Sequence, residues 1–127
     1  MATPARPTTK ALGDAVEQRA LEHLSGHGLV LVQRNYRVAR GPSARGGEVD
    51  LVMRDRDGTL VFVEVRARRD DRFGGAAASV GAAKRRSIVL AATYFLRRLP
   101  VPPPCRFDVV AVDGERIEWL RAAFDAQ

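Results

Sequence analysis

Apolar and polar residues along this chain follow two periods, and the change between them separates helices from strands. Between residues 11 and 24, apolar side chains recur at the spacing of one helical face, which predicts a helix there. The segment Gly26-His27-Gly28 ends this helix. From Leu29 onward, short apolar or alternating runs separated by turn residues indicate strands.

These patterns continue to the end of the chain in a mixed order. Strands are predicted over residues 29–37, 47–52, 60–67, 107–112 and 116–120. A second helix is predicted from Ser79, a suitable N-cap residue, to Leu99, where Pro100 ends it. The order is α-β-β-β-α-β-β, which predicts an α/β fold with a β-sheet flanked by helices.

Length and composition are those of one folded domain. The chain has 127 residues, 46% of them hydrophobic, and no apolar run approaches the roughly 18 residues of a membrane span. We expect a single domain over residues 11–127 and a disordered tail over residues 1–10, which lack the apolar stretch of a signal peptide. The single Cys105 allows no internal disulfide, and we expect it in the core of a cytoplasmic protein.

Basic residues outnumber acidic residues in this sequence. There are 21 lysines and arginines against 15 aspartates and glutamates, so the formal net charge at pH 7 is +6. A cationic protein attracts acidic polymers. We therefore expect nucleic acid as a partner, and no membrane.

Two carboxylates interrupt neighbouring apolar strands. Asp50 and Glu64 each lie in a predicted strand, and the Asp57-Gly58 pair between these strands is typical of a tight hairpin, which would bring the two acids together. An ionised carboxylate in an apolar strand costs several kcal/mol unless it is paired or binds a metal. Two of them on adjacent strands suit Mg²⁺ or Mn²⁺, whereas zinc would require His or Cys ligands.

Three further charged side chains are predicted near this pair. Lys84 falls within the inward stripe of the second helix, so its ammonium group either extends to water or reaches the carboxylates. Glu17 flanks the apolar stripe of the first helix, where an isolated glutamate is usually solvated or salt-bridged. Glu48 shares the strand face of Asp50 and is either a third metal ligand or a charge at the rim.

Several segments together resemble the bacterial YraN-type family of uncharacterised small proteins. They are Gly47-Glu48-Val49-Asp50-Leu51-Val52, Phe62-Val63-Glu64-Val65-Arg66-Ala67-Arg68, Phe73-Gly74, Lys84 and Arg106-Phe107-Asp108-Val109-Val110. The resemblance extends from about Leu12 to Phe124. By this resemblance the fold is a restriction-endonuclease-like mixed β-sheet flanked by helices, whose nucleases carry an Asp and then an (Asp or Glu)-x-Lys motif. It is also similar to archaeal Holliday junction resolvases.

The resemblance implies a metal-dependent nuclease. Asp50 and Glu64 match the metal-binding acids of the motif, and Glu17 matches the helix acid that often supplements them. Together with the backbone carbonyl of Val65, these residues would hold one or two Mg²⁺ or Mn²⁺ ions for phosphodiester hydrolysis. The expected substrate is DNA, branched or junction DNA included, and the resemblance also allows a homodimer.

Arg66 departs from the motif, which has lysine at this position. Arginine stays protonated and cannot act as a general base, although it can bind a phosphate through two hydrogen bonds. Lys84 matches a position where the family usually has lysine and would supply the missing ammonium group. Arginines in the loops 39–47 and 68–78 would hold the nucleic-acid backbone, unless they are merely solvated. These arginines are Arg45, Arg68, Arg69 and Arg72.

Two other classes of protein remain open. The chain could be a catalytically silent nucleic-acid-binding module, in which Asp50 and Glu64 stabilise the fold through salt bridges to Arg66 and Lys84. It could also bind another protein without nucleic acid. Acids that are paired internally should bind Mn²⁺ poorly, so a metal titration distinguishes these alternatives.

Overall fold

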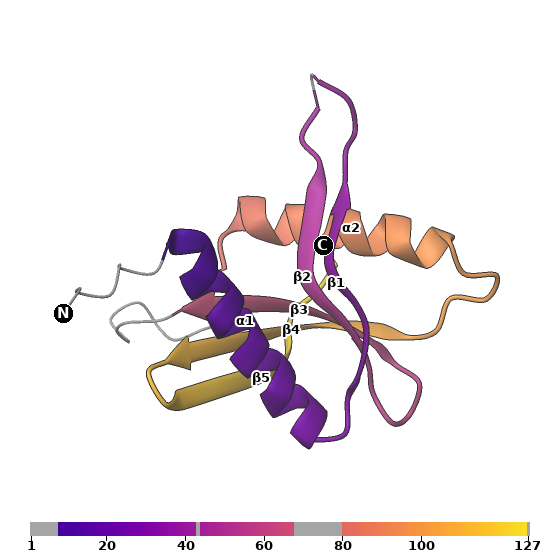
Figure 1. Ribbon diagram of the computed structural model, residues 1–127. Helices are drawn as coiled ribbons and strands as arrows, with labels where there is room; N and C mark the ends of the chain where they lie inside the picture. Colours follow the sequence, from indigo (N-terminus) through magenta and orange to yellow (C-terminus); the bar gives the residue numbers. More distant parts are fainter. Residues whose placement is uncertain (1–7, 43, 68–79, 127) are drawn as a thin grey trace.

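A mixed β-sheet lies between two helices in the computed structural model, which describes residues 8–42, 44–67 and 80–126 (Figure 1). The helices are α1 (Thr9–Gly26) and α2 (Ala82–Arg97). The strands are β1 (Val30–Val38), β2 (Gly47–Arg54), β3 (Leu60–Ala67), β4 (Cys105–Asp113) and β5 (Arg116–Phe124). The predicted order of elements and the α/β fold class are confirmed.

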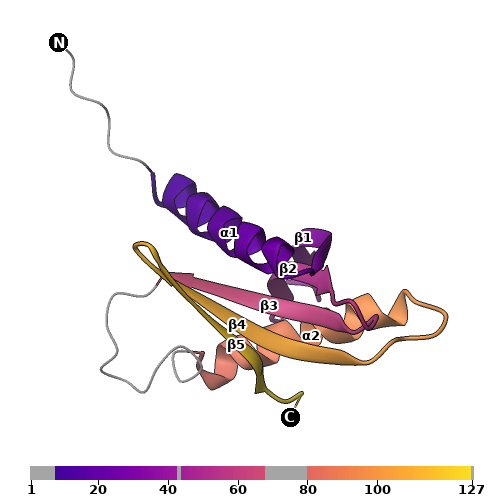
Figure 2. The ribbon, with the colours of Figure 1, turned by 90° about the horizontal axis from the view of Figure 1, so that it is seen from below.

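The strands lie side by side in chain order, β1-β2-β3-β4-β5. All neighbouring pairs are antiparallel except β3 and β4, which are parallel and are connected through α2. The predicted hairpin between the two acidic strands is confirmed as β2 and β3. Figure 2 shows α1 on one face of the sheet and α2 on the other.

The core consists of two apolar layers, one under each helix. Phe62 packs with Phe95 on the α2 face, whereas Val63 packs with Leu24 on the α1 face. Successive residues of β3 therefore alternate between the layers, as the period of a strand requires. This alternation directs Glu64, the residue after Val63, toward α2.

The β1–β2 pair changes faces halfway along its length. Val49 packs in the layer under α2, while Leu51 packs in the layer under α1, although two residues at this spacing normally share a face. Opposite them in β1, Asn35 has a φ of 51°, a left-handed conformation that accompanies the change. Asp50 consequently lies where the chain crosses from one face of the sheet to the other.

The first helix begins earlier than the sequence pattern predicts. It starts at Thr9, and the side chain of Thr8 accepts a hydrogen bond from the backbone of Ala11 as an N-cap. The last part of the predicted tail is therefore helical or caps the helix, and residues 1–7 lie outside the described residues. Within the described part of the chain, neither helix is sufficiently long and apolar to cross a membrane.

The start of the second helix and the position of Cys105 differ from their predictions. The N-cap of α2 is Gly81, which makes no side-chain capping bond, and the predicted cap Ser79 lies outside the described residues. Cys105 is exposed at the first position of β4, so the prediction that it lies in the core is wrong. The pattern failed there because Cys105 follows a proline-rich turn and precedes the buried part of the strand.

Candidate functional site

Asp50 and Glu64 meet where β2 and β3 stop pairing. The backbone register of the hairpin ends at the pair Leu51–Val63. Beyond it, Oδ2 of Asp50 accepts a hydrogen bond of 2.8 Å from the backbone N–H of Val65. The carboxyl groups of Asp50 and Glu64 also lie within hydrogen-bonding reach of each other when one carries a proton. The structure thus brings together the two acids that the sequence singled out.

Glu64 is a buried acid, with 3% of its surface exposed. Burial raises its pKa to about 9, and both the hydrogen bond with Asp50 and the charge of Asp50 act in the same direction. The positive charges of Lys84 and Arg66 oppose this rise only in part. In the absence of a metal ion, Glu64 therefore keeps its proton at neutral pH.

Lys84 connects Glu64 to Glu48. Its Nζ lies 3.7 Å from Oε2 of Glu64 and 3.1 Å from Oε1 of Glu48. Burial alone would lower the pKa of Lys84, but the charges of Glu64 and Glu48 outweigh burial and raise the pKa. The contact with Glu48 is the shorter one, so Lys84 keeps an acidic partner even when Glu64 is protonated. The ammonium group of Lys84 was predicted either to extend to water or to reach the carboxylates. In the structure it lies beside the carboxylates.

Arg66 extends along the same strand face as Glu64. Its Nε lies 3.8 Å from Oε2 of Glu64, and its side chain is one-third exposed. The guanidinium group is therefore close to the buried acid and still accessible from solvent. Both acids and both cations line one open depression, whose lining residues are Asp50, Glu64, Val65, Arg66, Ala67 and Lys84.

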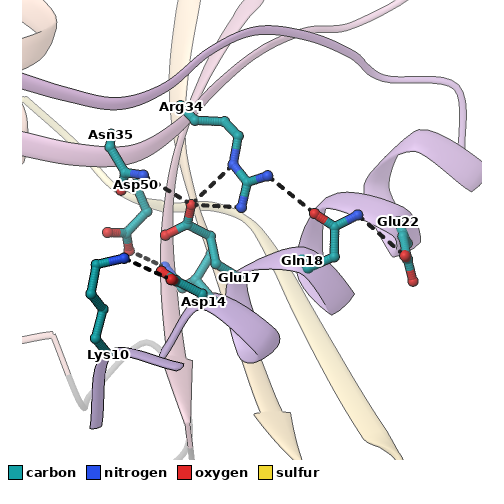
Figure 3. Close-up of polar contacts among 9 residues, drawn as sticks. Lys10, Asp14, Glu17, Gln18, Glu22, Arg34, Asn35 and Asp50 are labelled. Carbon is teal, nitrogen blue, oxygen red and sulfur yellow. Dashed lines mark hydrogen bonds and ion pairs between the residues drawn. The ribbon is translucent and has the colours of Figure 1, made fainter. Parts of the chain in front are cut away.

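Glu17 lies on α1, near Asp50 (Figure 3). Its Oε1 accepts hydrogen bonds from Nε and Nη2 of Arg34, both at 3.2 Å, and from Nδ2 of Asn35 at 3.4 Å. Burial raises the pKa of Glu17, the hydrogen bond from Arg34 lowers it, and the charge of Asp50 raises it further. Of the solvated and salt-bridged states expected for Glu17, the structure thus has the salt-bridged one. Glu17 also lines a second depression together with Asp50.

Glu48 takes part in ion pairs at the edge of the site. Besides Lys84, it contacts Nε of Arg37 at 3.4 Å, and its side chain is 44% exposed. Of the two roles predicted for Glu48, a charge at the rim is the one that these contacts describe.

The donor set beside Asp50 fits a hard divalent cation. Within residues 8–42, 44–67 and 80–126, no three His, Cys, Asp or Glu side chains form a group that could hold a metal ion by themselves. Two carboxyl groups line the depression, and Asp50 is held in place by the backbone N–H of Val65, so water or substrate oxygens would supply most of the coordination. Mg²⁺ is commonly bound in this way, through one or two carboxylates with retained waters and substrate phosphates.

Only one of the four predicted nucleic-acid-binding arginines lies within the described residues. Arg45 is exposed in the loop between β1 and β2. The other three, Arg68, Arg69 and Arg72, and the Phe73-Gly74 pair lie outside the described residues.

Asp108, in the last segment of the sequence motif, belongs to a separate buried cluster. Its carboxylate accepts hydrogen bonds from Nε of Arg106 at 3.0 and 3.2 Å, from Nε1 of Trp119 at 3.0 Å and from the backbone of Ala122 at 2.9 Å. These donors fully engage a carboxylate that has no exposed surface. Asp108 therefore stabilises the pairing of β4 with β5 rather than the site at Asp50.

Comparison with known proteins identifies close relatives of this chain. Residues 16–112 match the model of the uncharacterised protein family UPF0102. A UPF0102 protein of Methylibium petroleiphilum is 66% identical over 119 residues, which cover 94% of this chain and 98% of the relative. A UPF0102 protein of Paracidovorax citrulli is 61% identical over 121 residues, covering 95% of this chain and 87% of the relative.

One solved structure is similar in chain arrangement. The crystal structure of SSO0001 matches with a TM-score of 0.49 at 15% sequence identity. The match covers 93% of this chain and 54% of that chain.

Proposed function

The chain belongs to the uncharacterised protein family UPF0102, and we propose that it is a Mg²⁺-dependent endonuclease that hydrolyses phosphodiester bonds in DNA. The observation that carries this proposal is the pair of adjacent carboxyl groups, Asp50 and Glu64, at an open strand end. The raised pKa of Glu64 reflects a buried acid kept beside another acid, an arrangement that is costly to the fold and concentrated at functional sites.

Each residue of the depression has a role in this proposal. Asp50, Glu64 and the carbonyl of Val65 hold Mg²⁺ or Mn²⁺, which supplies an activated water and neutralises charge on the scissile phosphate. Lys84 and Arg66 donate hydrogen bonds to phosphate oxygens as negative charge develops there. Arg66 acts here as a charge donor, which does not require it to lose a proton.

Glu17 holds a supporting position in this proposal. Its Oε1 accepts hydrogen bonds from Arg34 and Asn35, so Oε2 is the oxygen through which Glu17 would supplement Asp50 as a metal ligand. Branched or junction DNA is the substrate that the resemblance to resolvases suggests, and the homodimer belongs to the same part of the proposal.

A second candidate function is nucleic-acid binding without cleavage. It is favoured by the contact of Lys84 with Glu48 at 3.1 Å, because internally paired charges can persist for the stability of the fold alone. Glu64 lies 3.7 Å from Lys84 and 3.8 Å from Arg66 and joins these pairs when it loses its proton. In that case the cations that would meet the phosphate are already engaged by the acid.

A Mn²⁺ titration and a cleavage panel of branched, nicked, single-stranded and supercoiled substrates test both candidates. We expect the wild type to bind Mn²⁺ and cleave at least one substrate, and Asp50→Asn to lose both properties with little change in stability. The amide removes the charge beside the buried Glu64, and its oxygen can still accept the hydrogen bond from the backbone N–H of Val65. Asp113→Asn, at the exposed last position of β4, is the matched control. Metal binding that persists in Asp50→Asn, together with a large loss of stability, would favour the silent module.

A further inference from the structure

A second charged region of this chain is a cleft between the β1–β2 loop and α2. Its lining residues are Arg40, Arg45, Gly46, Ala83, Arg86, Ser87 and Leu90. Three arginines thus line one cleft, and in the described part of the chain none of the three has a carboxylate partner. By contrast, Arg37 in the same hairpin is paired with Glu48. Guanidinium groups that gather without an acid are a ready site for an anion.

Two glycines allow close packing beside the cleft, Gly47 against α2 and Gly46 against the end of β1. A Cβ atom on Gly47 would lie 2.5 Å from the carbonyl oxygen of Ser87 and 2.8 Å from the backbone nitrogen of Ala91. A Cβ atom on Gly46 would collide with the carbonyl oxygen of Val38. Oγ of Ser87 also accepts a hydrogen bond of 3.1 Å from the backbone of Glu48, which fixes the start of β2 on α2. The segment that carries these arginines is therefore closely packed on α2 where β2 begins.

The cleft is continuous with the acidic site. Arg40, Gly46 and Ser87 also line an adjoining depression that contains Glu48. Glu48 contacts Lys84, and Lys84 contacts Glu64. The first turn of α2 carries no acidic residue and its N-cap makes no side-chain bond, so the amide groups at this helix end add to the positive potential. A polyanion bound at Lys84 can thus continue into the cleft without meeting an unpaired acid.

We propose that Arg40, Arg45 and Arg86 bind the sugar–phosphate backbone of a nucleic-acid duplex beside the acidic site, an inference that rests on the proposed function. Arginines bind phosphates through paired hydrogen bonds and carry no sequence preference when they contact only the backbone. Among the residues that the structure describes, the lining contains no aromatic side chain, whereas sites for unpaired strands stack their bases on aromatic rings. The cleft therefore selects a duplex arm rather than a single strand.

Binding in metal-free buffer tests this inference separately from catalysis. Fluorescence anisotropy is measured on duplex DNA, duplex RNA and single-stranded DNA with the triple variant Arg40→Gln, Arg45→Gln, Arg86→Gln. We expect its affinity for duplexes to fall at least about tenfold and the slope of log K against log salt to become shallower by about 2 to 3, since each lost phosphate contact removes about 0.9.

The matched control is the triple variant Arg54→Gln, Arg56→Gln, Arg97→Gln, which removes the same charge from positions outside the cleft. We expect the control to bind duplexes within about threefold of wild type, because it loses the same net charge as the cleft variant but no phosphate contact. An equal loss of affinity in both variants would overturn the inference, and so would an equal loss for single strands. Wild-type Mn²⁺ binding and cleavage report on the proposed function, so its failure is seen in a different measurement.

Discussion

The buried carboxyl group of Glu64 should make the stability of the metal-free protein depend on pH. Its pKa rises on folding from the ordinary 4.5 to about 9, mainly through burial, so the folded chain keeps a proton that the unfolded chain releases in this range. The free energy of unfolding of the metal-free protein should therefore fall as pH rises from about 5 to 9.

Glu64→Gln should remove this pH dependence, because the amide resembles the protonated acid and does not titrate. Relative to wild type, the variant should gain stability with rising pH by up to about 1.4 kcal/mol per pH unit, the value for one proton. Denaturant unfolding with a chelator at several pH values measures the difference. Glu22→Gln, at an exposed position of α1, controls for loss of a carboxylate. Parallel curves for wild type and Glu64→Gln would contradict the raised pKa.

Arg66 and Lys84 should differ in how far catalysis depends on them. Arg66→Lys restores the nuclease motif and should preserve or increase metal-dependent cleavage. Lys84→Ala should lower cleavage by about one to three orders of magnitude, or about 1.4 to 4 kcal/mol, the scale of one lost charge contact in the transition state. Single-turnover cleavage measures both variants beside Asp50→Asn. No change in Lys84→Ala would remove Lys84 from the proposed mechanism.

At this scale the sequence predicted the acid pair and the charged side chains near it, but not the residues that bind Glu17. Asp50 and Glu64 were found because a charge in an apolar strand breaks a simple pattern, and the Asp57-Gly58 turn implied that they meet. The contacts of Glu17 with Arg34 and Asn35 could not be found in this way. They depend on the left-handed conformation of Asn35, which reverses the faces of the strand and has no periodic signature.

At the scale of elements, substitution by alanine should have opposite effects at Gly47, where β2 packs closely on α2, and at Gly13, which lies in open space on α1. Gly47→Ala places a methyl group against the backbone of Ser87 and should destabilise the fold by about 1–3 kcal/mol. Gly13→Ala in α1 meets none of the described atoms within 4 Å and should stabilise it by about 0.5–1 kcal/mol through helix propensity. Denaturant midpoints measure both, and equal effects would contradict the close approach of hairpin and helix.

The order of the elements was predictable because the strand period of two residues differs clearly from the helix period of 3.6. The ends of the elements were not predictable in this way. α1 and α2 begin at positions set by local capping: Thr8 supplies a side-chain cap one turn before the apolar stripe, and Gly81 supplies none. The parallel pairing of β3 with β4 was also beyond the pattern, since it depends on where α2 crosses the sheet.

At the scale of the whole molecule, the net charge of +6 is unevenly distributed between the site and the surface around it. The acids of the site are buried or engaged by Lys84, Arg34 and Arg37, so the cations that remain dominate the surface around them. Such a field speeds the encounter with a polyanion and holds it without reading its sequence. Affinity should therefore be governed by ionic strength more than by the base sequence of the nucleic acid.

This distribution predicts a salt-sensitive interaction with nucleic acid. If about four phosphates are contacted, the slope of log K against log salt should be roughly −3 to −4, because each neutralised phosphate releases bound counterions. Anisotropy titrations of wild type in metal-free buffer, on two duplexes of unrelated sequence, should give the same slope and nearly the same affinity. An affinity that does not change with salt, or binding to only one of the two duplexes, would contradict recognition of the nucleic-acid backbone. A slope that is steep in wild type and shallow in the Arg40, Arg45 and Arg86 variant would assign the electrostatic contribution to the cleft beside α2.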